Sequence, residues 1–213
     1  MKAPDGPATT REPFTRVVSP AVAIAHNDID TDRIIPARYL TAVGREGFGE
    51  LLFADWRHAE DGSSRPASAL DRPGAAGRRI LVSGHNFGCG SSREHAVWAL
   101  MAWGFRVVVA GSFADIFTSN ALKNGLLPVR VDADRLEGIG TMLEADPDAE
   151  LTVDLESQVL GLPDGSEIAF EVDPFARRML LDGTDELGYL LARSAEIDAY
   201  EERHPAPIST LPR

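Results

Sequence analysis

The sequence of 213 residues predicts an α/β domain built around one mixed β-sheet. Between residues 79 and 131, strand-like and helix-like segments alternate, which is typical of parallel strands joined by right-handed crossovers. Beyond residue 150, short strand-like segments follow one another with little between them, which indicates an antiparallel half. The length and a hydrophobic content of 44% suit a single domain over residues 1–213 with one substantial core.

The N-terminal part is expected to hold short strands, a turn-rich cluster and a long loop. Residues 1–13 are polar and contain prolines, and they predict a tail. The apolar stretches 15–18 and 21–25 predict two strands broken by Ser19-Pro20. A short helix is expected around 48–53, and the segment 57–79, rich in Ser, Pro, Ala and Gly, predicts a long loop.

The remaining elements follow from clear periodicity and clear stop signals. Strands are predicted at 80–83, 106–110 and 127–131, with helices at 93–103 and 113–123 between them. After a helix at 134–144, antiparallel strands are predicted at 151–155, 158–160 and 167–172. Helices at 174–181, 186–192 and 195–203 lead into a C-terminal tail at 204–213.

Composition excludes several classes of protein. A formal net charge of −12 argues against binding to nucleic acid or to an anionic membrane surface. No apolar run approaches the length of about 20 residues that a membrane span needs, and the N-terminus lacks the apolar core of a signal peptide. A cytoplasmic protein is therefore predicted. The single cysteine, Cys89, excludes an internal disulfide and a metal site built from several thiolates of this chain.

The charge is unevenly distributed along the chain. Residues 1–106 carry 13 basic and 12 acidic side chains, whereas residues 107–213 carry 8 and 21. Chemistry that binds an anion is therefore expected in the first half, although an acidic second half is also an ordinary solubilising surface.

The most informative segment is GHNFGCGSSREHA, residues 84–96. It lacks the spacing of a P-loop, the third glycine of a dinucleotide fingerprint and the G-x-S-x-G elbow of serine hydrolases. What it offers is a glycine-rich turn that leads into a helix N-terminus. Ser91-x-x-Glu94 matches a capping box, in which Ser91 would cap the helix and Glu94 would return the hydrogen bond.

The same segment also suits binding and activation of an anion. Gly88 and Gly90 allow a close backbone approach, and a helix N-terminus favours a carboxylate or an oxyanion. Arg93 can bind a carboxylate with both arms of its guanidinium group, and such surroundings could stabilise the alkoxide of Ser91. The capping and catalytic interpretations are compatible. For His95 and Cys89 we favour packing roles.

The segment GHNFGCGSSREHAVWAL, residues 84–100, resembles the G-S-S-R-E-H signature of the swivelling domain in the aconitase superfamily. Its N-F-G-C portion is similar to the small subunits of bacterial 3-isopropylmalate dehydratases. The stretches NDIDTDRIIP at 27–36 and GSFADIF at 111–117 also fit, and the likeness runs in order from about residue 17 to residue 200. The resemblance implies an aconitase-type swivelling β/β/α domain.

The resemblance also implies a reaction and a partner. In that family, 2-isopropylmalate loses water to give isopropylmaleate, which is rehydrated to 3-isopropylmalate in leucine biosynthesis. The hydroxyl group leaves from a [4Fe–4S] cluster held by a separate large subunit, over which the small subunit closes. This chain would therefore be half of a hydro-lyase that acts on a small dicarboxylate and binds no cofactor alone.

Site residues carry over position by position. The first serine of the signature is the family's proton-abstracting base and corresponds to Ser91. The arginine that binds substrate carboxylate corresponds to Arg93, with Ser92 expected to donate to the same carboxylate. In the D-T-D motif, the family's active-site aspartate corresponds to Asp32.

Three further residues are expected to contact substrate. Arg45 is the best match to a second substrate-binding arginine, with a short gap required. The apolar side chains of Ile34 and Ile35 could face the isopropyl group, and plain packing of both is the alternative. The other functions that we keep open are the small subunit of a homoaconitase or of a methyl-substituted maleate hydratase, and a non-catalytic anion-binding module.

Overall fold

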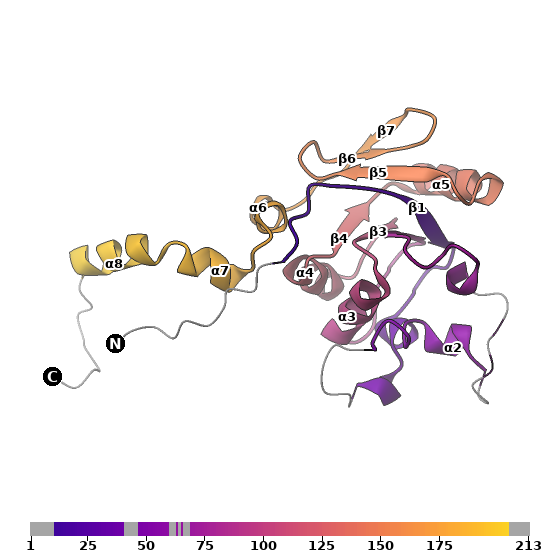
Figure 1. Cartoon of the computed structure of the whole chain (residues 1–213), viewed down its shortest axis with the longest axis horizontal. Coiled ribbons are helices and arrows are strands. Elements are labelled where there is room, and N and C mark those ends of the chain that lie inside the picture. The colour runs from indigo at the N-terminus through magenta and orange to yellow at the C-terminus, as the bar shows by residue number, and fades with distance from the viewer. Residues whose placement is uncertain (1–10, 41–46, 60–62, 64, 66–68, 205–213) are drawn as a thin grey trace.

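The structure is a computed structural model that describes residues 11–40, 47–59, 63, 65 and 69–204. Its centre is a seven-stranded mixed sheet with the strand order β4-β3-β2-β1-β5-β6-β7 (Figure 1). The strands are β1 (Arg16–Ile24), β2 (Ile80–Ser83), β3 (Val107–Ala110), β4 (Leu127–Arg130), β5 (Glu150–Asp154), β6 (Val159–Gly161) and β7 (Glu167–Ala169). Strands β1 to β4 pair in parallel, and β1, β5, β6 and β7 pair antiparallel, so the predicted mixed sheet is confirmed.

Helices cover both faces of the sheet. The α-helices are α1 (Thr31–Ile34), α2 (Ala54–Arg57), α3 (Glu94–Trp103), α4 (Asp115–Asn124), α5 (Ala133–Ala145), α6 (Pro174–Asp182), α7 (Glu186–Leu191) and α8 (Ser194–Arg203), with 3₁₀ turns η1 (Ala37–Tyr39) and η2 (Ala69–Asp71). One apolar cluster packs α3 and α4 against one face, and a second packs α5 and α6 against the other (Figure 1).

The parallel strands have both faces buried, which explains their continuous apolar sequences. Along β2, Ile80 belongs to the cluster around α5, and Leu81 belongs to the cluster around α3. Strand β3 divides its residues in the same way, with Val107 and Val108 on opposite faces. The register Ile80↔Val107 therefore continues each layer from one strand to the next.

Pro20 does not break the first strand, and the prediction of two strands there is wrong. Residues 16–20 pair antiparallel with β5, and the parallel pairing with β2 begins only at Ala21. Proline lacks a backbone N–H, and Pro20 occupies the position where the strand changes partner. Ser19 assists this change because its hydroxyl accepts from the backbone N–H of Arg79 at 2.9 Å.

The helix predicted around 48–53 is also displaced. Residues 47–53 form successive turns, and the regular helix α2 starts only at Ala54. Phe53 has a φ of 50°, in the left-handed region, which interrupts a continuous helix. A buried position explains this conformation, because the Phe53 side chain is fully enclosed in the core.

The predicted loop at 57–79 carries structure at both of its ends. Arg57 ends α2 and is 9% exposed, and its Nη2 lies 2.9 Å from Oδ1 of Asp71 in η2. Two further bonds run from Nη1 of Arg57 to the carbonyl oxygens of Glu50 and Leu52. Residues 60–62, 64 and 66–68 of this segment lie outside the described residues.

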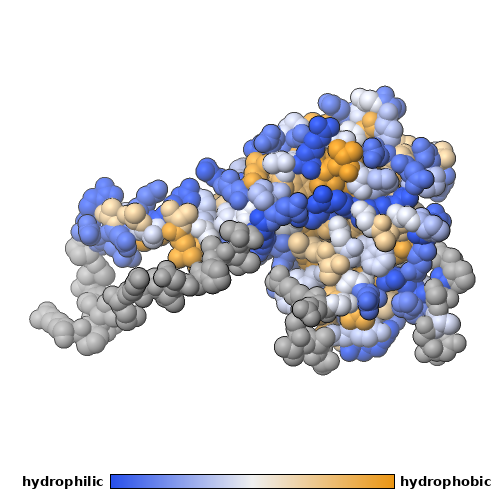
Figure 2. All heavy atoms as spheres, in the orientation of Figure 1, coloured by the Kyte–Doolittle hydropathy of each residue, from blue (hydrophilic) through white to orange (hydrophobic). Residues whose placement is uncertain are grey.

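The C-terminal helices extend away from the sheet (Figure 1). Figure 2 shows apolar side chains at the surface of this arm, and the exposed ones in α7 and α8 are Leu187, Leu190, Leu191, Ile197 and Tyr200. In the part of the chain that the structure describes, no helix is long and apolar enough to cross a bilayer.

Candidate active site

Three loops meet at the carboxyl edge of the parallel strands, where open α/β sheets place their ligands. They follow β1, β2 and β3, and each contains one of the motifs recognised in the sequence. The N–H of Gly88 donates to the carbonyl of Ile29 at 2.7 Å, which joins the second loop to the first. The N–H of Phe87 donates to the carbonyl of Ser112 at 3.0 Å, which joins it to the third.

Glycine is required at two positions of the central loop. Gly88 has a φ of 74° and Gly90 a φ of 87°, both in the left-handed region. A Cβ at Gly88 would lie 2.2 Å from Cγ of Phe117, so the loop backbone packs directly on α4. This close packing fixes the path of the chain towards Ser91.

The D-T-D segment holds the end of the glycine loop. Thr31 donates from its N–H to the carbonyl of Cys89 and from its hydroxyl to the carbonyl of Ser91, both at 2.9 Å. Nη1 of Arg93 pairs with Oδ1 of Asp32. The structure therefore brings together Asp32, Ser91 and Arg93.

The capping box predicted at Ser91 is absent. Helix α3 begins at Glu94, and its N-cap is Arg93, with no side-chain capping bond. The carboxylate of Glu94 accepts instead from Nδ2 of Asn124 at 2.7 Å. Ser91 and Ser92 are exposed, and within the described residues the Ser91 hydroxyl has no hydrogen-bond partner. The Ser91 hydroxyl therefore does not cap α3 and is accessible to a ligand.

Asn124 is a supporting residue to which sequence reasoning assigns no contact: Asn124-Gly125 predicts a helix stop and belongs to a stretch that resembles the family. It is 4% exposed at the end of α4. Its amide nitrogen also donates to the carbonyl of Asn120 at 2.9 Å, and its oxygen accepts from Nε1 of Trp98 at 3.2 Å. The start of α3 is thereby fixed to α4 immediately after Arg93.

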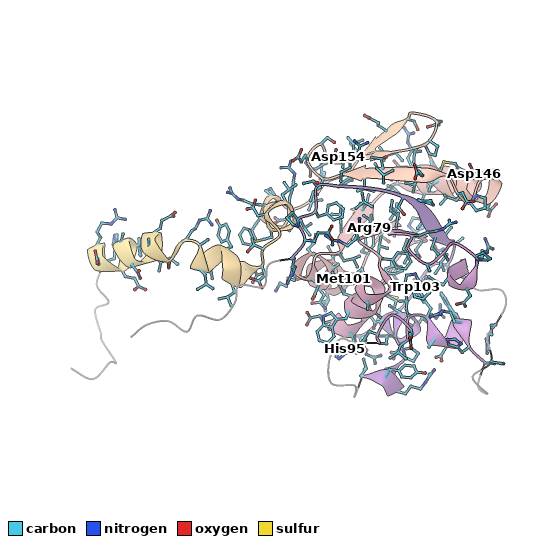
Figure 3. The ribbon with its side chains drawn as sticks, viewed as in Figure 1. Arg79, His95, Met101, Trp103, Asp146 and Asp154 are labelled. Carbon is cyan, nitrogen blue, oxygen red and sulfur yellow. The ribbon has the colours of Figure 1, made fainter. Side chains whose placement is uncertain are left out.

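His95 packs against aromatic rings, and the Cys89 thiol has a raised pKa. Figure 3 shows His95 near the start of α3, and its ring lies 4.7 Å from that of Trp98 and 5.8 Å from that of Phe48. Burial raises the pKa of the Cys89 thiol above its ordinary value, and the carboxylates of Asp30 and Asp28 raise it further. A raised pKa keeps this thiol protonated and unreactive near neutral pH.

The other predicted contacts are placed differently. Ile34 and Ile35 are both 0% exposed and pack in the cluster beneath α3, so the structure agrees with the packing alternative for these two side chains. Arg45 lies outside the described residues.

The side chains of the described residues do not fit a metal ion, and the single cysteine does not fit an iron–sulfur cluster. Among the described residues, no three side chains of His, Cys, Asp or Glu gather where they could hold a metal ion. The whole chain has one cysteine, whereas a [4Fe–4S] cluster takes several thiolates.

Known proteins are similar to this chain in sequence and in fold. The family model of the aconitase C-terminal domain matches residues 12–134, and the model LeuD_N matches residues 142–174. A 3-isopropylmalate dehydratase small subunit from Chloroflexus aggregans is 48% identical over 202 residues, which cover 95% of this chain and 99% of the relative. One from Anaeromyxobacter dehalogenans is 52% identical over 190 residues, covering 89% and 97%.

The chain belongs to the 3-isopropylmalate dehydratase small-subunit family. A crystal structure of the 3-isopropylmalate dehydratase LeuD of Methanocaldococcus jannaschii aligns with a TM-score of 0.62 at 28% identity. The alignment covers 87% of this chain and 99% of that protein. Both the family resemblance and the aconitase-type fold predicted from the sequence are confirmed.

Proposed function

We propose that this chain provides the general base and the carboxylate-binding arginine of a hydro-lyase that interconverts 2-isopropylmalate and 3-isopropylmalate. Family membership supports the reaction, and leucine biosynthesis in the cytoplasm is its expected setting. The observation that carries the assignment is the exposed, uncapped Ser91 two residues from Arg93, whose guanidinium is paired with Asp32.

Ser91 takes the proton from the carbon next to a carboxylate. A hydroxyl group is a weak base until its alkoxide is stabilised. Positive charge from Arg93 and from the start of α3, whose first turn has no side-chain cap, provides that stabilisation. In the hydration that gives 3-isopropylmalate, the Ser91 hydroxyl delivers the proton to the other carbon of the double bond, the one that bears the isopropyl group, and water adds to the carbon that lost the proton.

Arg93 binds the carboxylate on which negative charge develops. Its Nη1 is paired with Asp32, which fixes the orientation of the planar guanidinium. Ser92 is exposed beside it and donates to the same carboxylate. Interactions that strengthen as this charge develops lower the barrier of the proton-transfer step.

The leaving hydroxyl needs a Lewis acid that this chain does not provide. We assign a [4Fe–4S] cluster to a separate large subunit, because the donor set here does not fit one. The exposed position of Ser91 and Ser92 agrees with a site that is completed at an interface between two chains.

The test uses the chain reconstituted with a cluster-bearing large subunit. Ser91→Ala should retain assembly and substrate binding but lose nearly all turnover, by at least about a hundredfold, as expected for removal of a general base. Ser92→Ala is the matched control, and we expect mainly a raised KM. Retention of most of the activity by Ser91→Ala refutes the base assignment.

Substrate profiling of the same complex tests the reaction itself. We expect higher kcat/KM with 2-isopropylmalate than with a tricarboxylate such as homocitrate. A clear preference for the tricarboxylate contradicts the proposed substrate and leaves the role of Ser91 intact.

A further inference from the structure

A cavity of about 740 Å³ lies beside the carboxyl end of β1, next to α1. Its apolar lining includes Ile24, Phe53 and Leu70, and neither Ser91 nor Arg93 contributes to it. The volume falls within the range of about 300–1,000 Å³ that small-molecule sites occupy. The cavity therefore has the size and the lining of a ligand site separate from the glycine loop.

Aromatic rings form one wall of the cavity. The rings of Phe53 and Trp56 are stacked 5.2 Å apart with an angle of 4° between them. The ring of His26 lies 5.3 Å from that of Trp56. The stacked rings give the cavity a large apolar surface.

Three arginines line the same cavity: Arg33, Arg65 and Arg72. Within the described residues, Arg65 and Arg72 form no ion pair. Arg33 forms a long one, with 4.0 Å between its Nε and Oδ2 of Asp30. All three side chains belong to exposed residues. This gathering of positive charge contrasts with the net charge of −12 of the whole chain.

In a neighbouring cavity, by contrast, an arginine is paired with a carboxylate. It has about 710 Å³ and is lined by Arg38, Tyr39 and Asp55, with Arg65 between the two cavities. There Arg38 pairs with Asp55. Arg65 and Arg72, unlike Arg38, have no carboxylate partner among the described residues.

We propose that the cavity beside β1 binds a small organic dianion, a molecule with two carboxylate or phosphate groups on an apolar body. Guanidinium groups bind carboxylates and phosphates with good geometry. The apolar lining and the Trp56 ring contact the rest of the molecule, which distinguishes it from an inorganic anion. Neither Arg93 nor Ser91 lines this cavity, and its Arg33 directly follows Asp32 in α1.

Calorimetric titration of the full chain without a large subunit tests this site at low ionic strength, because salt screens exposed charges. The probes are 2-isopropylmalate, benzene-1,2-dicarboxylate and inorganic phosphate. We expect saturable binding of the two organic dianions with one site per chain and weaker binding of phosphate. The double variant Arg65→Gln/Arg72→Gln should weaken binding of the organic dianions by about tenfold, as expected for loss of two exposed charge pairs.

One control variant separates this site from the neighbouring cavity. Arg38→Gln alters that cavity alone and should leave the affinity for the organic dianions within about twofold. Thermal melts verify that all variants are folded. The proposal is overturned by any of three results: absence of saturable binding, an affinity unchanged by the double variant, or phosphate binding as tight as that of the organic dianions. The proposed function does not depend on this outcome, because it is tested by turnover of the assembled enzyme.

Discussion

Nη1 of Arg93 is paired with Oδ1 of Asp32, although the two residues are 61 positions apart in the sequence. The Arg93 side chain is 19% exposed and that of Asp32 is 49% exposed, so the pair lies at the surface of this chain. A surface pair of this kind contributes little to stability. The pair instead orients the Arg93 guanidinium, because Asp32 binds one of its nitrogens and leaves the others for a ligand.

Asp32→Asn should therefore impair substrate binding more than folding. We expect KM of the reconstituted enzyme to rise about fivefold, the effect of losing about 1 kcal/mol of orienting interaction. The melting temperature should fall by less than about 4 °C. Arg93→Lys should be more severe, since it retains the charge but loses the planar fork. Wild-type steady-state kinetics in Asp32→Asn would remove the orienting role.

Asn124 should be a stability determinant through the start of α3. Asn124→Ala removes the donor to Glu94 and the acceptor of Trp98 at a site that is 4% exposed. We expect the free energy of unfolding to fall by about 1–3 kcal/mol, the contribution of the hydrogen bonds that Asn124 makes to the Glu94 carboxylate and to Trp98. Urea denaturation measures this change.

The matched control for that variant is Asn120→Ala. The described network uses only the backbone carbonyl of Asn120, which the substitution keeps. Asn120→Ala should therefore be neutral or slightly stabilising, because alanine favours helix. Equal destabilisation by the two variants would contradict a specific role for Asn124.

Gly88→Ala should be more damaging than the backbone conformation alone explains. A non-glycine residue in the left-handed region costs about 1–2 kcal/mol. Gly77 has a φ of 94°, and nothing lies within 4 Å of the position that a Cβ would take there, so Gly77→Ala measures that cost by itself. At Gly88 the added Cβ also meets the Phe117 ring, and we expect a larger loss of stability together with loss of turnover. Similar denaturation midpoints for the two variants would exclude the steric contribution.

The alternating strands and helices between residues 79 and 131 could be predicted because the sequence signals that begin and end them are local. Apolar stretches such as 80–83 are bounded by turn residues, and Gly125 ends α4 close to the predicted position. The predictions fail where a segment distant in sequence determines the local structure. Pro20 is tolerated because β1 changes partner there, which no pattern around residue 20 reveals.

In the candidate site, too, local motifs identify residues, whereas contacts between distant segments could not be predicted. The motif order brought Asp32, Ser91 and Arg93 forward as candidates, and the fold places them together. The capping box failed because Glu94 bonds to Asn124, 30 residues away, instead of returning to its own helix start. Ile34 and Ile35 have a suitable apolar character for a substrate contact, but only the packing of α3 over them shows that they are buried.

Cys89 should be less reactive in the folded chain than in the unfolded one. Burial raises the pKa of its thiol, and Asp30 and Asp28 add to the effect by disfavouring a second negative charge nearby. In the unfolded chain a cysteine titrates at about 8.5. The pH midpoint of alkylation by iodoacetamide should therefore lie above that value in buffer and return to it in urea. Cys89 is the only thiol, so the incorporated label reports this site alone.

Two variants assign the cause of that shift. Asp28→Asn removes one of the two carboxylates while keeping an oxygen that can accept from Nδ2 of Asn86, so the native midpoint should fall towards the unfolded value. Asp55→Asn removes a carboxylate whose partner is Arg38 and should leave the midpoint unchanged. A native midpoint at or below about 8.5 would mean that the helix N-terminus, which lowers a thiol pKa, dominates over burial and the carboxylates.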